Sequence, residues 1–314
     1  MIGGNMRTQK FAAAAFMLFT GERTQSLPRA PRKSATETPR HRETSENLCV
    51  SVSPWLIRLC VLFLLGVSSV MAAARAADRV PATGGDIEIT PFFHSSVQIE
   101  HAGKVIQVDP WSVGELSRAK PADLILVTDD PGHHLDVKAI LQLRKPGAPV
   151  VIPASGKPKV PDGLVLANGE TANPAGVKVE AIAAYDIKPG EPSHPKGKSN
   201  GYVITLGGKR LYVAAVTECV PEVRALKNID VAFMPMNIPV ERMTPSAAAE
   251  CVKALAPKIV YVYHYDQAAA ARLTNPGATA AGPAGGLTVA QSLQAFKDAL
   301  RGQVIEVRDG RWYP

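Results

Sequence analysis

Five histidines lie at the ends of predicted strands or in the loops beside them. They are His94, His133, His134, His194 and His264. Open α/β folds gather such loops at one edge of a sheet, where side chains from distant segments can meet. Neutral imidazole is the commonest metal ligand among side chains, and the histidine side chain titrates near neutral pH. The pattern predicts a site that binds a metal ion or transfers a proton, with His94 left open between facing this site and lying apart from it.

The densest group of such residues follows the apolar run at 123–128. The segment 128–136, Thr-Asp-Asp-Pro-Gly-His-His-Leu-Asp, places two carboxylates and two imidazoles in a tight loop. Their desolvation is costly unless a cation or hydrogen bonds offset it. Zinc takes nitrogen and oxygen ligands and lowers the pKa of its bound water to about 7. The segment therefore favours a metal-dependent hydrolase.

Hairpins and alternating strands and helices are predicted to position these residues. Alternation around a turn predicts one hairpin over 96–108, and Gly207-Gly208 predicts a second between 201–206 and 209–216. The other predicted strands are 87–89, 123–128, 149–152, 177–183, 230–236, 258–265 and 304–307. This order predicts sheets packed inside with helices outside.

Three helices are predicted from their capping residues. Asp136 is suited to cap a helix over 137–144, and Thr244-Pro245 begins one that runs to about residue 255. Thr288 and Gln291 form a capping box for residues 289–300. Residues 266–286, rich in Ala, Gly and Pro, are predicted to be a long loop.

The order of motifs resembles that of metallo-β-lactamase-fold hydrolases, and within them a branch similar to ascorbate-phosphate lactonase. The match extends over about residues 86–313. Its landmarks are the first hairpin, Asp109-Pro110, the 128–136 segment, His194-Pro-Lys-Gly with Asn200-Gly-Tyr, Thr217-Glu218 and Tyr263-His-Tyr265. The resemblance implies a mixed α+β/α/β class, a four-layer αβ/βα sandwich, with a site at one edge that usually holds two zinc ions.

The resemblance also implies which residues stand at the metal positions. The first motif of the family, His-x-His-x-Asp-His, falls on Asp129, Pro131, His133 and His134. Asp129 matches a variant of the branch and His134 matches the pattern. Pro131 offers no side-chain donor atom, and His133 stands where the family has an aspartate.

Two further histidines match, and one carboxylate is lost. His194 and His264 fall on family ligands, whereas the bridging aspartate falls on Val216. The first metal of a pair would then keep only Asp129 and His194, too few for a catalytic zinc. The second would keep His134 and His264, with His133 in place of the lost carboxylate.

Three histidines and a water form a known catalytic zinc site, so the expectation is a single zinc ion or none. For His133, the roles of metal ligand, general base and plain loop residue stay open. Asp129 is the second candidate for a catalytic role, as ligand or base.

Charge distribution bears on the partners of the protein. Of 35 Lys and Arg, 10 lie in residues 1–76 together with only 4 of the 28 Asp and Glu, so the rest carries a net charge of about +1. A protein that binds nucleic acid through phosphates needs a basic face. We therefore expect a small-molecule substrate and no nucleic acid; the oligomeric state is not predicted.

The N-terminal part has the features of an export signal. Arg58 precedes an uncharged run over 59–74, and Ala74-Arg75-Ala76 fits a cleavage site. The alternative, a membrane anchor, would need roughly 18–20 apolar residues. The expected organisation is a disordered or spurious extension (1–57), a signal peptide (58–76) and a metallo-β-lactamase-like domain (77–314), periplasmic or secreted, without a stable membrane span after cleavage.

Cys219 and Cys251 remain in the expected mature chain. In an oxidising compartment they could form a disulfide. Cys251 lies in a helical pattern among alanines, which favours a small core residue over a disulfide.

Two functions of different classes follow from these observations. The first is an exported hydrolase that acts on an ester, lactone, amide or phosphoester through a zinc-activated water. The second is a periplasmic binding protein that keeps the fold but has lost the two-metal site. Val216 favours the binding protein, and the retained imidazoles favour the enzyme.

Overall fold

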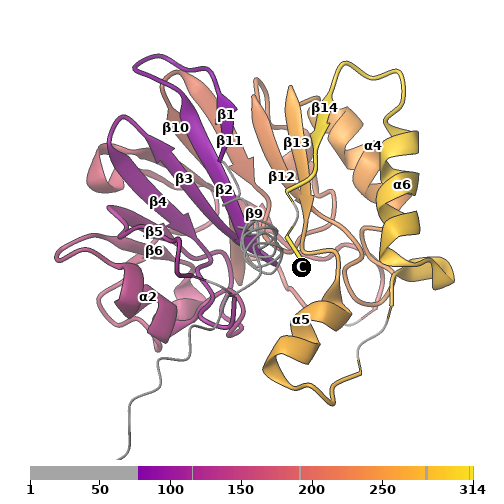
Figure 1. The fold of residues 1–314 in the computed structure, drawn as a ribbon, viewed down its shortest axis with the longest axis horizontal. Helices are drawn as coiled ribbons and strands as arrows, with labels where there is room; N and C mark the ends of the chain where they lie inside the picture. Colours follow the sequence, from indigo (N-terminus) through magenta and orange to yellow (C-terminus); the bar gives the residue numbers. More distant parts are fainter. Residues whose placement is uncertain (1–76, 115, 191, 280–281, 311, 314) are drawn as a thin grey trace, which may run out of the picture. The chain divides into compact units, whose positions relative to one another are not determined.

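The computed structural model describes residues 77–314 except 115, 191, 280–281, 311 and 314. Two seven-stranded sheets form its centre (Figure 1). The first holds, in this order, β1 (Asp78–Val80), β2 (Ile87–Phe93), β3 (Ser96–His101), β4 (Lys104–Val108), β5 (Leu124–Leu126), β6 (Val150–Ile152) and β7 (Leu164–Val165). The second holds β14 (Glu306–Arg308), β13 (Ile259–Tyr263), β12 (Val231–Pro235), β11 (Lys209–Val213), β10 (Ser199–Leu206), β9 (Lys178–Ala184) and β8 (Thr171–Ala172).

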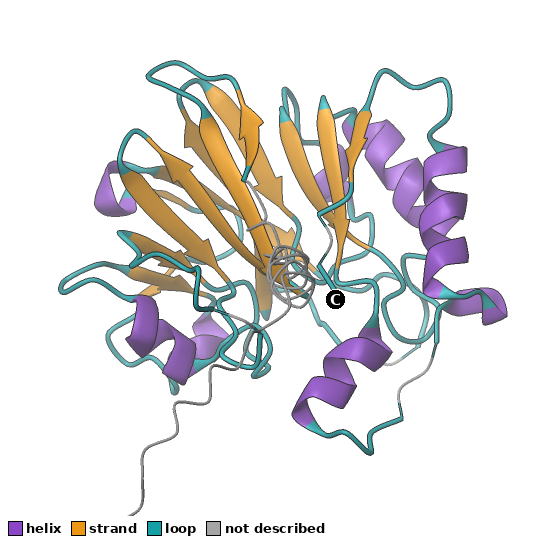
Figure 2. Ribbon diagram, in the orientation of Figure 1, coloured by secondary structure: helices purple, strands orange, loops and turns teal. Residues whose placement is uncertain are grey.

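Helices flank the sheets (Figure 2). They are α2 (Val137–Leu143), α3 (Pro221–Arg224), α4 (Pro245–Leu255), α5 (Gln267–Thr274) and α6 (Val289–Ala299), with short 3-10 turns at Ala154–Gly156, Pro174–Gly176 and Ala284–Gly286. Helix α2 lies beside the first sheet, and α4 packs against α6 beside the second. The predicted αβ/βα sandwich is confirmed.

Each sheet is antiparallel at one side and parallel at the other. Strands β1 to β4 pair antiparallel, and β4 to β7 pair parallel. The second sheet repeats this plan, with β8 to β11 antiparallel and β11 to β14 parallel. Parallel strands need crossover connections, and two of these connections, after β5 and after β13, carry His133 and His264.

Strand β5 shows how the layers are held. Leu124 and Leu126 belong to the apolar core that residues of both sheets form, whereas Ile125 belongs to a second cluster with Ile140 of α2. Side chains of a strand alternate between its two faces. A strand buried on both faces therefore shows the uninterrupted apolar run seen in the sequence.

The predicted hairpins and helix caps are confirmed. Strands β3 and β4 pair antiparallel, as do β10 and β11. The side chains of Asp136 and Thr244 accept backbone N–H groups at the starts of α2 and α4. The capping box at Thr288 is complete.

The prediction of a long loop over 266–286 is wrong in its first part. Helix α5 occupies Gln267–Thr274, and Asp266 caps it by accepting the N–H of Ala269. Four consecutive alanines follow Gln267, and alanine is the strongest helix former. The expected last strand, 304–307, lies at Glu306–Arg308, and β1, β7, β8 and α3 were not predicted.

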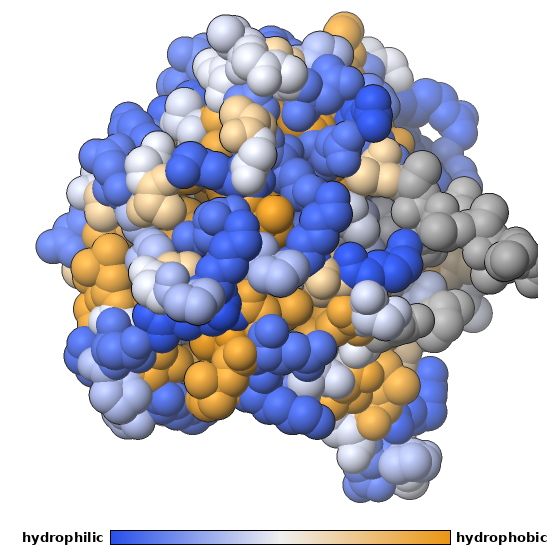
Figure 3. All heavy atoms as spheres, turned by 60° about the vertical axis from the view of Figure 1, so that its left-hand side comes forward, coloured by the Kyte–Doolittle hydropathy of each residue, from blue (hydrophilic) through white to orange (hydrophobic). Residues whose placement is uncertain are grey.

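The expected extension (1–57) and signal peptide (58–76) lie outside the described residues. Within the described part, none of the helices combines the length and apolar character needed to cross a bilayer. On the face that Figure 3 turns forward, apolar side chains lie between polar ones. Exposed apolar residues include Val137 and Leu141 of α2, and single exposed apolar residues are ordinary on a folded domain.

Cys219 and Cys251 form a disulfide, with their Cα atoms 5.5 Å apart. Cys219 follows β11 and Cys251 lies in α4. The bond therefore joins the loop after β11 to a helix of the outer layer. The pairing corrects the interpretation that the sequence favoured for Cys251, a small core residue without a disulfide.

Removing this bond is expected to destabilise the fold. The cysteines are 32 residues apart. A disulfide that closes a loop of this size stabilises the folded state by about 2–4 kcal/mol, because it lowers the conformational entropy of the unfolded chain. The Cys219→Ala/Cys251→Ala variant should lose that free energy of unfolding in denaturant titrations. A reducing agent should produce a similar loss in the unmodified chain and none in the variant. If the free energy of unfolding of the unmodified chain did not change with the reducing agent, this expectation would be wrong.

Candidate metal centre

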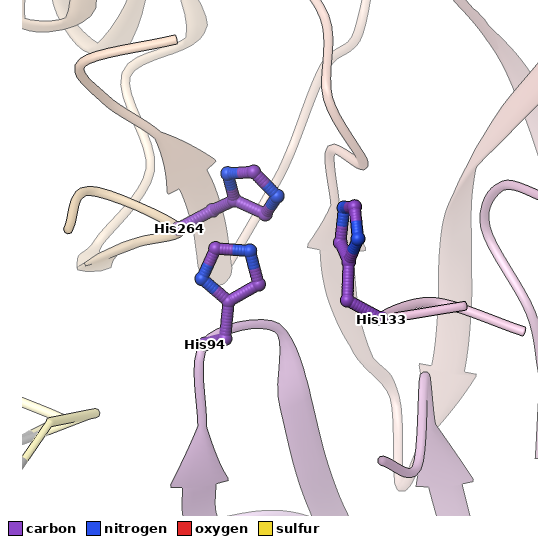
Figure 4. Close-up of side chains that lie close together, drawn as sticks. All are labelled: His94, His133 and His264. Atoms are coloured by element: carbon purple, nitrogen blue, oxygen red, sulfur yellow. The ribbon is translucent and has the colours of Figure 1, made fainter. Parts of the chain in front are cut away.

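Three histidines from separate segments converge at the edge of the sandwich. His94 lies in the turn between β2 and β3, His133 in the loop between β5 and α2, and His264 directly after β13. Each offers a ring nitrogen within 4.8 Å of the other two. Figure 4 shows the rings directed toward a common space. Among the described residues, this is the group of His, Cys, Asp and Glu side chains whose spacing suits a metal ion.

The backbone brings two of these residues together. The N–H of His264 donates to the carbonyl of His94 at 3.1 Å, and the two ring centroids are 3.7 Å apart. His94 and His264 have φ values of 58° and 54°, and nearby Asp109 has 42°. Non-glycine residues rarely adopt this left-handed region, which is found preferentially at functional sites.

Neighbouring side chains orient the two rings. Nδ1 of His94 lies 2.7 Å from the hydroxyl of Tyr313, which also accepts the N–H of Asp266 at 3.2 Å. The side-chain amide of Gln267 donates to the carbonyl of His264 and lies 2.9 Å from its Nδ1. Nε2 of His264 is buried and has no hydrogen-bond partner among the described residues. An unpartnered buried nitrogen costs free energy, and a metal ion would satisfy it.

His134 is held by a buried carboxylate. Its Nδ1 lies 2.7 Å from Oδ2 of Asp109, and Asp109 also accepts the backbone N–H and the hydroxyl of Thr128. The imidazole stacks against that of His264, with centroids 5.2 Å apart and planes at 7°. Nε2 of His134 is buried, and the described part of the chain gives it no hydrogen-bond partner. Metal ligands and proton acceptors are usually oriented in this way, with one ring nitrogen of the histidine held by a carboxylate and the other left for the metal ion or the proton.

Burial keeps the three converging imidazoles neutral. Burial, followed by repulsion from neighbouring histidines, lowers the pKa of His94 and His264 well below 6.5 and that of His133 to about 3. For His134, burial also lowers the pKa, but the charge of Asp109 and the hydrogen bond to it outweigh burial, so that its pKa is raised. The three neutral rings suit metal ligation, and a pKa of about 3 makes His133 a weak general base at neutral pH.

The predicted site residues thus fall into two groups. His133 and His264 converge with His94, and His134 lies against them. Asp129 and His194 form a separate pair, with Oδ2 and Nε2 3.6 Å apart. His194 is near enough to His133 to lower the pKa of that ring by repulsion. The Asp129 and His194 side chains therefore border the cluster without joining the three-histidine group.

The Asp129–His194 pair continues into a buried ionic chain. Nδ1 of His194 lies 3.5 Å from Asp186, and Asp186 lies 3.6 Å from Nε of Arg242. Arg242 is in turn 3.8 Å from Glu218. The cationic guanidinium of Arg242 stabilises the carboxylates of Asp186 and Glu218. Val216, at the position of the family's bridging aspartate, is buried and apolar.

A pocket of about 380 Å³ opens beside the cluster. His94 and His133 form part of its wall, together with Trp111. Helix α5 also lines it, through Gln267, Ala270, Ala271 and Thr274. The size is near the lower end of the range for small-molecule sites.

These pKa shifts predict acid sensitivity of the metal-free protein. As pH falls below 6.5, the unfolded chain protonates His94, His133 and His264, whereas the folded chain does not until lower pH; for His133 the window extends to about 3. Each such histidine lowers the free energy of unfolding by up to ~1.4 kcal/mol per pH unit. His134, with its raised pKa, acts in the opposite direction and only above about pH 6.5, where the folded chain still binds the proton that the unfolded chain has lost.

Denaturant titrations with chelator at pH 7, 6 and 5 would measure this slope. In a His133→Asn variant, the slope of the free energy of unfolding against pH should fall by up to ~1.4 kcal/mol per pH unit, the contribution of one proton. An identical slope in the variant would show that His133 is protonated equally in both states.

Comparison with known proteins supports a metal-binding role. The model of the Beta-lactamase superfamily domain matches residues 88–264. A UPF0173 metal-dependent hydrolase from Pyrobaculum calidifontis is 29% identical over 193 residues, 57% of this chain and 84% of that protein. The solved structure of a protein from Parabacteroides distasonis, named as a metal-dependent hydrolase, is 34% identical with a TM-score of 0.63 and covers 74% of this chain and 97% of its own. The metallo hydrolase Igni18 from Ignicoccus hospitalis is 21% identical with a TM-score of 0.53 over 71% of this chain and 94% of its own, which shows the fold alone.

Proposed function

The chain belongs to the β-lactamase superfamily, and on this premise we propose that it is an exported hydrolase of small molecules that uses one zinc ion. The relatives named as metal-dependent hydrolases support the reaction class. The observation that carries the proposal is the convergence of three imidazole nitrogens within 4.8 Å of one another.

The donor set fits zinc. His94, His133 and His264 are neutral at pH 7 because burial lowers their pKa. Three histidines leave a position for water, as in catalytic zinc sites. His133 and His264 belong to the set expected from the sequence, and His94 takes the third place. Pro131 and Val216 offer no donor atom, which favours one ion over two.

The remaining residues act on protons and on the substrate. A bound zinc ion supplies the Lewis acidity that makes water nucleophilic near neutral pH. His134 keeps its proton on Nδ1, toward Asp109, and its Nε2 accepts a proton from the attacking water. Asp109 fixes that tautomer and stabilises the imidazolium that forms, as a buried aspartate does beside a catalytic histidine. The pocket beside Trp111 binds the substrate.

The second candidate is a binding protein that does not turn over its ligand. The buried, apolar Val216 at the position of a bridging carboxylate favours it. Both candidates use the same pocket. They differ in whether the histidines hold a metal ion and whether bound ligand is hydrolysed.

Metal analysis and ester hydrolysis discriminate between these functions. The purified chain from residue 77, dialysed against zinc, should contain one ion per chain by elemental analysis and hydrolyse p-nitrophenyl esters. A chelator should abolish hydrolysis, and added zinc should restore it. The His101→Ala variant, which changes a histidine at the end of β3 outside the site, is the control. Two tightly held ions contradict the single-metal site, and a metal-free, inactive chain favours the binding protein.

Export is part of the same proposal. The disulfide between Cys219 and Cys251 supports it, since such bonds persist mainly in oxidising compartments. Mass spectrometry of the protein from a periplasmic fraction should find a chain that begins at Ala77. A cytoplasmic chain with an intact N-terminus would contradict export.

A further inference from the structure

One face of α5 lines the pocket beside the histidine cluster. Gln267, Ala270, Ala271 and Thr274 recur at the spacing of one helical face. Two of these four residues are alanines, whose small side chains leave the space open. Ala270 packs with Phe93 and Trp111, so the helix is anchored where it borders the pocket.

The described residues that line the pocket offer no ionic partner to a substrate. Of the described residues that line it, none is Lys, Arg, Asp or Glu. Arg272, also on α5, lines a separate cavity of about 180 Å³ together with Asp266. Lys159 and Lys198, near the loop that carries His133, contact Asp130 instead. An anionic substituent that lies against Trp111 and α5, away from the metal ligands, would lose its hydration without gaining a cation.

Trp111 supplies the flat apolar wall. It is buried, and its ring centroid lies 5.4 Å from that of Phe93. The same ring lies 5.8 Å from His94 and 6.0 Å from His133. A chain that packs on the indole therefore places its neighbouring carbonyl beside the metal ligands.

We propose that the substrate is an uncharged carboxylic ester or lactone whose apolar acyl chain packs between Trp111 and α5. This inference rests on the proposed hydrolase function and narrows it, because substrates with a carboxylate at the far end of the acyl chain are excluded. The zinc site takes the carbonyl end, and the alanine face of α5 takes the chain.

A matched pair of esters tests the chemistry of the pocket. p-Nitrophenyl hexanoate and mono-p-nitrophenyl adipate share the leaving group and the length of the chain and differ by a terminal carboxylate. The zinc-loaded protein should hydrolyse the hexanoate with kcat/KM about 30-fold or more above that of the adipate. Equal values, or a preference for the adipate, would overturn the proposal.

A charge placed on the helix should reduce this preference. In Ala271→Arg the new cation faces the pocket, and the adipate should gain about 10-fold relative to the hexanoate. Leu273→Arg adds the same charge at an exposed position of α5 that does not line the pocket, and its ratio should stay unchanged. If both variants changed the ratio equally, the effect would be one of net charge and the assignment to this pocket would be wrong.

Binding to metal-free protein separates this inference from the hydrolase proposal. After chelation, no metal ion is left to bind hexanamide or the monoamide of adipic acid. Calorimetry then compares the affinities of the two amides for the metal-free protein. Tighter binding of hexanamide supports the pocket assignment even if neither ester is hydrolysed, in which case the hydrolase proposal alone fails. Equal affinity, tighter binding of the adipic monoamide or no binding of either amide contradicts the assignment.

Discussion

The His264→Asn variant is expected to lose at least ~10³-fold in kcat/KM for p-nitrophenyl esters, about 4 kcal/mol of transition-state stabilisation. The substitution removes one of three imidazoles that converge within 4.8 Å. Asparagine tolerates left-handed backbone, so the φ of 54° at this position adds no new strain. The zinc content of the purified variant should fall below one ion per chain.

The control for this experiment is a histidine outside the cluster. His101→Ala should keep its zinc and its activity, whatever its effect on stability. The three-histidine centre would be refuted by a His264→Asn variant that retains both a full zinc content and the kcat/KM of the unmodified protein.

The Asp109→Asn variant is expected to lower kcat for p-nitrophenyl esters by about 10²–10⁴-fold, the usual contribution of a positioned general base, while the zinc content stays at one ion per chain. The new amide would present an N–H to Nδ1 of His134, which now contacts the carboxylate at 2.7 Å. His134 would then move its proton to Nε2, and that nitrogen could no longer accept one. The free energy of unfolding should also fall by about 2–4 kcal/mol, because a buried charged contact is broken.

Nitrogen NMR of His134 separates a change of tautomer from a general loss of structure. The spectrum should show the proton on Nδ1 in the unmodified protein and on Nε2 in Asp109→Asn. Asp123→Asn is the matched control, since Asp123 pairs with Lys145 at the partly exposed surface and such pairs contribute under about 1 kcal/mol. If both variants lost similar stability and the tautomer of His134 stayed the same, Asp109 would not act as the orienting group.

Local signals account for most of the fold that the sequence predicted. Capping residues such as Asp136 and Thr244 satisfy backbone N–H groups within three residues of themselves, so their effect is readable without tertiary structure. Helix α5 was missed because the flanking Gly and Pro obscured its alanine run. Its cap, Asp266, comes three residues after the end of β13 and was a readable signal.

The site was less predictable, because its residues come from segments far apart in the chain. Position in the family motif gave His134 a ligand place and left the role of the adjacent His133 open, whereas the structure groups His133 with His94 and His264. In the structure the N–H groups of His134 and Leu135 both donate to the carbonyl of Pro131. The resulting turn directs His134 toward Asp109 and His133 toward the pocket. The only signal for His94 was its position before the predicted hairpin. The backbone hydrogen bond from the N–H of His264 that brings His94 into the cluster joins the two sheets.

The left-handed backbone at His94, Asp109 and His264 gives a way to sort the relatives of this protein. At such positions glycine removes the strain, so a lineage freed from selection for the reaction should drift toward glycine at all three. A lineage that keeps the imidazoles and the carboxylate there retains side chains that the backbone alone would disfavour. Which descendants kept the chemistry could then be read from three columns of an alignment.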